Sequence, residues 1–163
     1  MDGEAGEEEA GRKALVIDTN VIISSMLRET GYTRKVLIVI ATLYPTYTPR
    51  YAIEEIHKHT LYLAEEKGIS REKQEALLEM ITRDIIIVDE EWYREYIQAA
   101  RELVGDPGDI DFVALSLKLR MIYRDVAIVT WNTGDYRKEA LREKGIRVLT
   151  PKEAAKSLLP SII

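Results

Sequence analysis

The chain contains no cysteine, only two histidines and no long apolar run. The absence of cysteine excludes a disulfide scaffold, a cysteine nucleophile and thiolate metal sites. The two histidines, His57 and His59, are too few for a His-rich zinc site. No apolar run reaches about 18 residues, so we expect no membrane-spanning helix. The acidic start, Met1-Asp2-Gly3-Glu4, is unlike a signal peptide, and we therefore expect a cytoplasmic protein.

The chain also lacks an excess of basic residues. Its net charge is −5, of which residues 1–13 contribute −3. This balance neither indicates nor excludes a nucleic-acid-binding protein. The length of 163 residues fits one domain. We expect a disordered acidic tail over residues 1–13, followed by a single domain over residues 14–163.

The hydrophobic pattern predicts short buried strands that alternate with helices. The predicted strands are 14–17, 46–48, 85–88, 126–130 and 146–149. The predicted helices are 20–28, 33–43, 49–66, 70–83, 90–104, 109–122, 135–144 and one that begins at 151. Strands that alternate with helices in this way predict a three-layer α/β/α sandwich around a central, mainly parallel five-stranded sheet.

Acidic side chains recur where the predicted strands end. In an open parallel sheet, ligands bind outside the carboxyl ends of the strands. Four carboxylates from distant segments are expected at that edge: Asp18, Glu55, Asp109 and Asp135. Taken singly, Asp18, Asp109 and Asp135 have a simpler explanation, since each stands where a helix begins and Asp is a favoured N-cap. Capping does not explain why all of them converge on one edge.

Helix geometry chooses between neighbouring acids. Glu55 lies about 110° from the centre of the apolar face of its helix and Glu54 about 150°, so Glu55 is the better placed to reach the sheet edge. Asp109 shares a helix face with Phe112, which we expect to be buried. Asp111 and Asp106 are close enough to serve as supporting or additional ligands, although we assign Asp106 in the first place to the preceding turn.

Several acids in one cleft repel each other and raise each other's pKa. A divalent cation relieves this repulsion, and oxygen ligands without Cys favour Mg²⁺ or Mn²⁺ over Zn²⁺. Such an ion lowers the pKa of a bound water and stabilises a leaving oxygen. The pattern therefore favours metal-assisted hydrolysis of a phosphodiester.

Five short motifs follow one another along residues 14 to about 158. They are Asp18-Thr19-Asn20; Pro49 with Glu54-Glu55-Ile56; Asp109 before Ala114-Leu115-Ser116; Thr130-Trp131-Asn132-Thr133-Gly134-Asp135-Tyr136; and Val148-Leu149-Thr150-Pro151. In this order and spacing they resemble the PIN-domain ribonuclease family.

The resemblance implies a metal-dependent ribonuclease that leaves a 5′-phosphate and a 3′-hydroxyl. The residues that would hold Mg²⁺ or Mn²⁺ are Asp18, Glu55, Asp109 and Asp135. Asn20 would orient Asp18 by hydrogen bonding. Some family members have Asp where this chain has Asn132, so either Asn132 or Asp135 is the closer ligand.

The resemblance also implies partners. Family members often form homodimers, and many are VapC-type toxins inhibited by an antitoxin protein, whereas others process RNA. The additional helix over 70–83 and the acidic tail depart from a compact toxin. A PIN-like module that binds RNA or protein without cutting is the alternative. A haloacid dehalogenase-like phosphatase is disfavoured because Asn20 stands where it would need a second Asp.

Cationic side chains are candidates for contacts to RNA phosphates, because Lys and Arg supply most non-specific affinity for nucleic acids. The candidates are Arg34, Lys35, Arg50 and Arg137. For each of them taken alone, a solvated surface charge is the favoured explanation.

Overall fold

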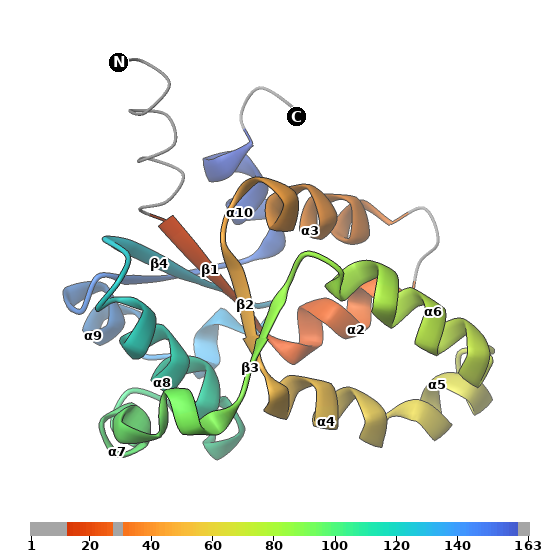
Figure 1. Ribbon diagram of the computed structural model, residues 1–163, viewed down its shortest axis with the longest axis horizontal. Helices are drawn as coiled ribbons and strands as arrows, with labels where there is room; N and C mark the ends of the chain where they lie inside the picture. The colour runs from red at the N-terminus through yellow and green to blue at the C-terminus, as the bar shows by residue number, and fades with distance from the viewer. Residues whose placement is uncertain (1–12, 28–30, 160–163) are drawn as a thin grey trace.

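The computed structural model describes residues 13–27 and 31–159, and it has one five-stranded sheet in which every strand pairing is parallel. The strands are β1 (Lys13–Ile17), β2 (Thr46–Pro49), β3 (Ile86–Val88), β4 (Asp125–Val129) and β5 (Ile146–Leu149). Their order across the sheet is β3-β2-β1-β4-β5 (Figure 1). The predicted sheet is confirmed. Residues 1–12 of the predicted tail lie outside the described residues, and Lys13 belongs to β1.

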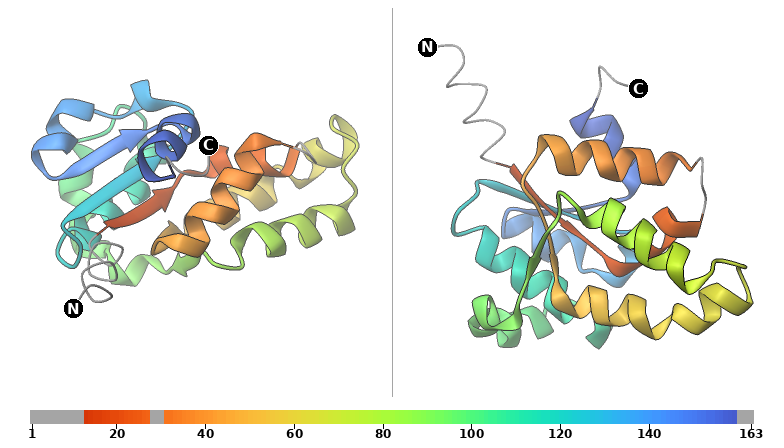
Figure 2. Two further views of the ribbon diagram at one scale, coloured as in Figure 1. Left: turned by 90° about the horizontal axis from the view of Figure 1, so that it is seen from above. Right: turned by 45° about the vertical axis from the view of Figure 1, so that its right-hand side comes forward.

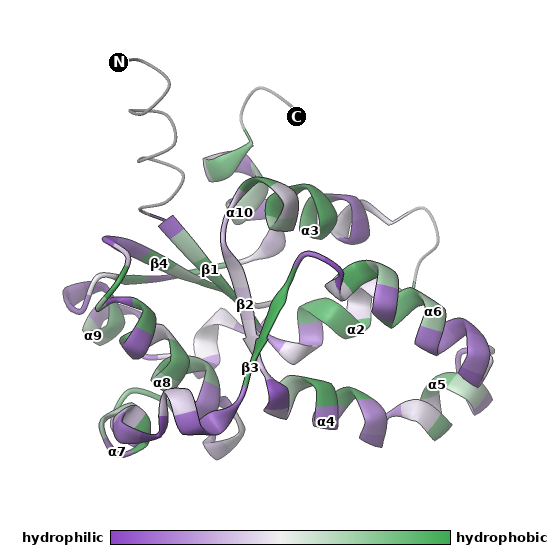
Figure 3. Ribbon diagram, in the orientation of Figure 1, coloured by the Kyte–Doolittle hydropathy of each residue, from purple (hydrophilic) through white to green (hydrophobic). Residues whose placement is uncertain are grey.

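The central strand β1 is apolar on both sides because helices cover both faces of the sheet. Leu15 and Ile17 belong to one core cluster, and Ala14 and Val16 belong to the other. A strand buried on both faces reads as a continuous apolar run rather than an alternation. Figure 3 shows this hydrophobic colour along β1 after Lys13.

The helices form the two outer layers. On one face lie α2 (Thr19–Leu27), α3 (Tyr32–Leu43), α6 (Arg71–Thr82) and α10 (Pro151–Leu158). On the other face lie α7 (Ile97–Arg101), α8 (Ile110–Leu119) and α9 (Lys138–Glu143) (Figure 1). The three-layer α/β/α sandwich is thus confirmed. None of the described helices is long and apolar enough to cross a membrane.

The predicted helix over 49–66 is two helices, α4 (Arg50–Lys58) and α5 (Thr60–Glu65). The break lies at His59, whose backbone N–H bonds to the carbonyl of Ile56 only three residues back. The Thr60 hydroxyl donates to the carbonyl of His57 at 2.8 Å. A side chain that takes a backbone carbonyl competes with the regular helical bonds. Beyond this break, α5 and α6 extend away from the sheet (Figure 2).

The predicted helix over 90–104 is wrong in its first half. Two 3₁₀ turns, Glu90–Trp92 and Arg94–Tyr96, come before α7. Tyr93 stands between the turns with its side chain buried, and its hydroxyl donates to Asp111 of α8 at 3.0 Å. Packing of this one aromatic side chain against α8 overrides the helical pattern, which is a tertiary effect. Likewise, the predicted helix over 135–144 is a 3₁₀ turn (Thr133–Asp135) and then α9.

The strand order places β1 and β4 side by side, so the segments that follow them lie next to each other. The order of connection reverses between β1 and β4, which pair in register from Lys13 with Asp125 to Ile17 with Val129. A crevice forms outside the carboxyl ends of the strands at such a reversal, because the connecting helices leave on opposite faces. The chain just after Ile17 and just after Val129 therefore lines one crevice.

Candidate metal centre

Asp18 is the first residue after β1, and its backbone N–H continues the sheet by bonding to the carbonyl of Val129 at 3.0 Å. Its side chain is only 5% exposed. Oδ2 of its carboxylate accepts two hydroxyls, from Thr130 at 2.8 Å and from Tyr136 at 2.9 Å. Burial raises the pKa of Asp18, and these hydrogen bonds oppose the rise. Asp18 is thus a buried carboxylate held in one orientation.

The Asn20 side chain reaches Asp18 through Thr130, whereas the backbone N–H of Asn20 bonds directly to the Asp18 carboxylate. The Asn20 amide donates to the Thr130 hydroxyl oxygen at 3.2 Å, and its carbonyl oxygen accepts the backbone N–H of Trp131 at 3.1 Å. The backbone N–H of Asn132 also donates to the Thr130 oxygen, at 3.1 Å. Through these bonds Asn20 positions the hydroxyl that holds Asp18.

A tight loop before α8 carries Asp106 and Asp109. The Asp106 carboxylate accepts the backbone N–H of Gly108 at 2.9 Å, which caps the 3₁₀ turn Pro107–Asp109. The Asp109 side chain makes no capping bond at the start of α8. The capping explanation therefore applies to Asp106 and is wrong for Asp109. The backbone N–H of Gly105 bonds to the carbonyl of Asp135 at 3.0 Å, which joins this loop to the loop after β4.

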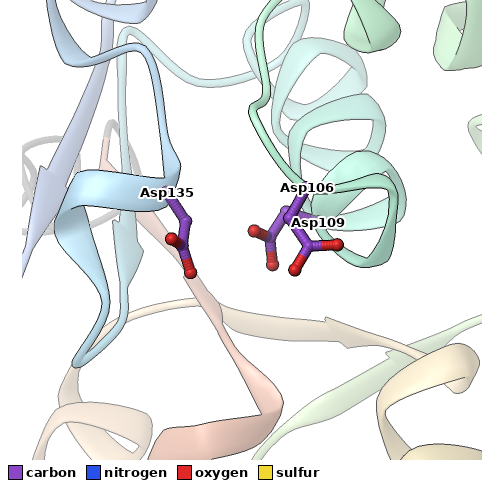
Figure 4. A group of neighbouring side chains, drawn as sticks. All are labelled: Asp106, Asp109 and Asp135. Carbon is purple, nitrogen blue, oxygen red and sulfur yellow. The ribbon is translucent and has the colours of Figure 1, made fainter.

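Asp106, Asp109 and Asp135 form a cluster in which one oxygen of each lies within 4.8 Å of the others. Their carboxylates point toward a common space between the two loops (Figure 4). Burial, together with the charges of Asp18, Asp106 and Asp135, raises the pKa of Asp109 to about 7. Oδ2 of Asp109 is buried and has no hydrogen-bond partner among the described residues. A buried acceptor without a partner is costly, because it has lost water and gained nothing.

Tyr136 lies between Asp18 and Asp109, the second of which belongs to this cluster. It is 4% exposed, and its ring belongs to the core cluster under α8. Its hydroxyl lies 2.9 Å from Oδ2 of Asp18 and 3.4 Å from Oδ1 of Asp109. Burial and the two carboxylates raise the pKa of Tyr136, so the hydroxyl keeps its proton. The sequence shows only that an aromatic residue follows Asp135, and a side chain for core packing would look the same.

Glu55 lies on α4 and is more buried than the exposed Glu54, as the helical geometry predicts. Its carboxylate hydrogen-bonds Tyr51, and this bond is the main cause of the raised pKa of Tyr51. The Tyr51 hydroxyl in turn lies beside Gly108 in the loop before α8. Glu55 is not part of the cluster of Asp106, Asp109 and Asp135. Its role as a metal ligand stays a prediction.

Two other predicted residues lie near the cluster with different contacts. Asp111 accepts the hydroxyl of Tyr93 at 3.0 Å, and burial raises its pKa. Asn132 is exposed and takes part in the site through its backbone N–H. Of Asn132 and Asp135, it is the Asp135 carboxylate that joins the cluster. Asp106, which we had assigned to a turn, belongs to both the turn and the cluster.

The four residues predicted to contact RNA phosphates differ in their exposure and in the groups that they already contact. Arg34 is 8% exposed and donates to the carbonyls of Ser25 at 2.6 Å and Met26 at 3.4 Å, so it holds the end of α2. Arg50 forms an exposed ion pair with Asp89. Lys35 and Arg137 are exposed, and Arg137 directly follows Tyr136.

Comparison with known proteins identifies the family of the chain and solved structures with a similar fold. A family model described as PIN domain matches residues 16–123, which include Asp18, Glu55 and Asp109. No curated protein matches the chain by sequence.

Two solved structures have a similar fold. A chain of VapBC2 from Rickettsia felis, bound to a DNA fragment from its promoter, has a TM-score of 0.56 and 12% identity over 84% of this chain and 98% of that chain. A chain of FitAcB from Neisseria gonorrhoeae has a TM-score of 0.54 and 19% identity over 85% and 98%. At these identities the likeness concerns the fold.

Proposed function

The chain belongs to the PIN domain family, and from this premise we propose that it is an endoribonuclease that requires Mg²⁺ or Mn²⁺. The proposal rests on one observation above all. Oδ2 of Asp109 is buried without a partner, beside the carboxylates of Asp106 and Asp135. A bound cation would supply what this oxygen lacks, and it would also offset the charges of its neighbours, since those named above are all anionic.

The donor set fits a hard divalent ion. Mg²⁺ and Mn²⁺ prefer carboxylate and water oxygens, and the crevice offers carboxylates without cysteine. Asp18, Asp109 and Asp135 would hold the ion, with Asp106 beside them and Glu55 as the predicted fourth acid. When bound, such an ion supplies an acidified water and a counter-charge for a phosphodiester.

The chain's own residues prepare the crevice for RNA. Thr130 and Tyr136 keep Asp18 in one orientation, so no reorganisation is needed when the ion and the substrate bind. The Trp131 side chain is 42% exposed and anchored by its indole N–H, which donates to the Ser24 hydroxyl at 2.8 Å. An anchored, exposed indole beside the crevice is suited to stack an RNA base. The exposed Arg137 is suited to a backbone phosphate.

An antitoxin protein is the partner we propose, and a homodimer is the assembly. Support for the antitoxin comes from the sequence resemblance to VapC-type toxins and from the likeness in fold to a chain of VapBC2. Co-purification of the full chain with the product of a neighbouring small gene tests the antitoxin. Size-exclusion chromatography with light scattering tests the dimer.

Cleavage of an end-labelled RNA tests the proposed activity. Purified wild-type protein with Mn²⁺ or Mg²⁺ should cut the RNA and leave a 5′-phosphate, and EDTA should stop the reaction. Asp109→Asn should be inactive, whereas Asp84→Asn, an exposed acid beside β3, should cut like wild type. Cleavage that persists in EDTA or in Asp109→Asn would show a contaminating nuclease. RNA binding without cleavage would favour the non-catalytic module instead.

A further inference from the structure

We propose that Tyr136 is a positioning residue that decides which carboxylate oxygens face the ion, an inference that rests on the proposed metal-dependent function. Within residues 13–27 and 31–159, it is the one side chain whose hydrogen-bonding group reaches both Asp18 and Asp109. These two acids come from β1 and from the start of α8, whereas Tyr136 follows the turn after β4. One hydroxyl thus links three segments that are far apart in the sequence.

The hydroxyl has a single proton, and the distances show where it goes. At 2.9 Å the bond to Oδ2 of Asp18 is a normal hydrogen bond, whereas the contact to Oδ1 of Asp109, at 3.4 Å, is long. Thr130 donates to the same Oδ2 of Asp18 at 2.8 Å. Two hydroxyl donors therefore share one oxygen of Asp18, and the backbone N–H groups of Thr19 and Asn20 also bond to this carboxylate. Because these bonds fix the carboxylate, Asp18 would present the same face to an ion whenever one binds.

The same hydroxyl selects the oxygen that Asp109 presents. Tyr136 lies on the Oδ1 side of this carboxylate, and Oδ2 is the oxygen that is buried without a partner. A partial rotation of the Asp109 carboxylate out of its present plane would cost the contact with Tyr136. Hydrogen-bonding partners of metal ligands fix ligand orientation in this way, and their loss typically weakens metal binding about 10- to 100-fold.

Core packing does not explain this hydroxyl. The Tyr136 ring packs with the core under α8, and a phenylalanine ring has the same shape. A buried hydroxyl is costly unless it is hydrogen-bonded. Here its partners are the buried Asp18 and the half-buried Asp109, and nothing else that the described part of the chain shows. The role of the Tyr136 hydroxyl is therefore to hydrogen-bond the carboxylates of Asp18 and Asp109.

The test compares two variants that each remove one buried tyrosine hydroxyl from an aspartate. Tyr136→Phe removes the hydroxyl from Asp18 and Asp109, and Tyr93→Phe removes the hydroxyl that Asp111 accepts at 3.0 Å. Mn²⁺ affinity is measured by isothermal titration calorimetry on the full chain, with circular dichroism as the check of folding. We expect Tyr136→Phe to bind Mn²⁺ about 10- to 100-fold more weakly. We expect Tyr93→Phe to bind it like wild type.

A second readout begins with the wild-type protein alone and so does not depend on the folding of a variant. Addition of Mg²⁺ to the wild-type protein should change the ultraviolet absorbance of a buried tyrosine, because the ion alters the charge next to the Tyr136 hydroxyl. The change should be lost in Tyr136→Phe and kept in Tyr93→Phe. An absent tyrosine signal, or equal losses of Mn²⁺ affinity in both variants, overturns the positioning role.

The outcomes separate this inference from the proposed function. If wild-type protein binds Mn²⁺, Asp109→Asn does not, and Tyr136→Phe binds like wild type or more tightly, the metal site stands and the role of Tyr136 is wrong. If the wild-type protein itself does not bind Mn²⁺ or Mg²⁺, both the metal site and the role of Tyr136 are wrong.

Discussion

Replacement of Asp109 by Asn should stabilise the metal-free protein and remove its response to metal. Burial and neighbouring acids raise the pKa of Asp109 from 3.8 to about 7. Between these two pH values the folded state binds more protons at this group than the unfolded state does, so stability falls as pH rises. Above pH 7 the full penalty applies.

The size of the effect follows from the pKa. A rise from 3.8 to about 7 corresponds to at most ~4 kcal/mol at alkaline pH. Water screens this partly exposed group, and we expect about 1–2 kcal/mol in practice. For a chain of this length, each kcal/mol shifts Tm by roughly 2–4 °C. At pH 8 in EDTA, Asp109→Asn should therefore melt a few degrees above wild type.

Divalent metal should reverse this order. Mg²⁺ at about 100 times its dissociation constant stabilises the protein that binds it by ~2.7 kcal/mol. Wild type should gain this stability and Asp109→Asn should not, so their melting temperatures should cross as Mg²⁺ is added. The assay is thermal unfolding followed by circular dichroism at pH 5 and pH 8, with EDTA or Mg²⁺. Asp84→Asn, an exposed acid, is the control and should follow wild type throughout.

Two results would refute the reasoning. If Asp109→Asn in EDTA is no more stable than wild type at pH 8, the acids do not strain the fold. If its advantage is as large at pH 5 as at pH 8, the gain does not come from ionisation of Asp109.

Three further predictions concern other parts of the molecule. Gly145→Ala should lower the free energy of unfolding by at least ~1 kcal/mol, because φ is +80° and the added Cβ would lie within 2.7 Å of the Arg120 guanidinium. Gly134→Ala, where the added Cβ meets open space, should not lower it, and chemical denaturation measures both variants. Asp18→Asn should abolish RNA cleavage but keep RNA binding, as a gel-shift assay would show, and loss of binding would contradict a purely metal-holding role. Arg137→Ala should weaken RNA binding and reduce its salt dependence, whereas Arg34→Gln should lower Tm and leave the salt dependence unchanged, since Arg34 donates to backbone carbonyls of α2.

Most of the fold could be predicted because buried strands and amphipathic helices leave a periodic signal. The strand Ile146–Leu149 is predicted to the residue, and the continuous apolar run of β1 indicates a strand covered on both faces. The errors lie where one side chain overrides that signal. Tyr93, buried against α8, breaks the segment over 90–104 into turns, and no local pattern reveals the partner against which it packs.

The candidate site divides in the same way. Asp18, Asp109 and Asp135 could be found because each follows a strand or begins a helix at the sheet edge where ligands bind. Asp106 was only a secondary candidate, since an Asp before Pro-Gly is typical of a turn, and it serves that turn as well as the cluster. The burial of Arg34 could not be predicted either, because the sequence does not show that the end of α2 lies next to it with backbone carbonyls that need hydrogen-bond donors.

By itself, the order of residues determined the class of fold and predicted which acids gather at the sheet edge and which kind of ion suits them, because apolar periodicity and ligand chemistry are local properties. Only the tertiary structure decided which oxygens meet. Whether the Tyr136 hydroxyl bonds a carboxylate depends on how closely β1, α8 and the loop after β4 approach one another, as the distances of 2.9 Å to Asp18 and 3.4 Å to Asp109 show. Distances of that kind are set by how two hydrophobic cores pack against one sheet, and no single segment records them.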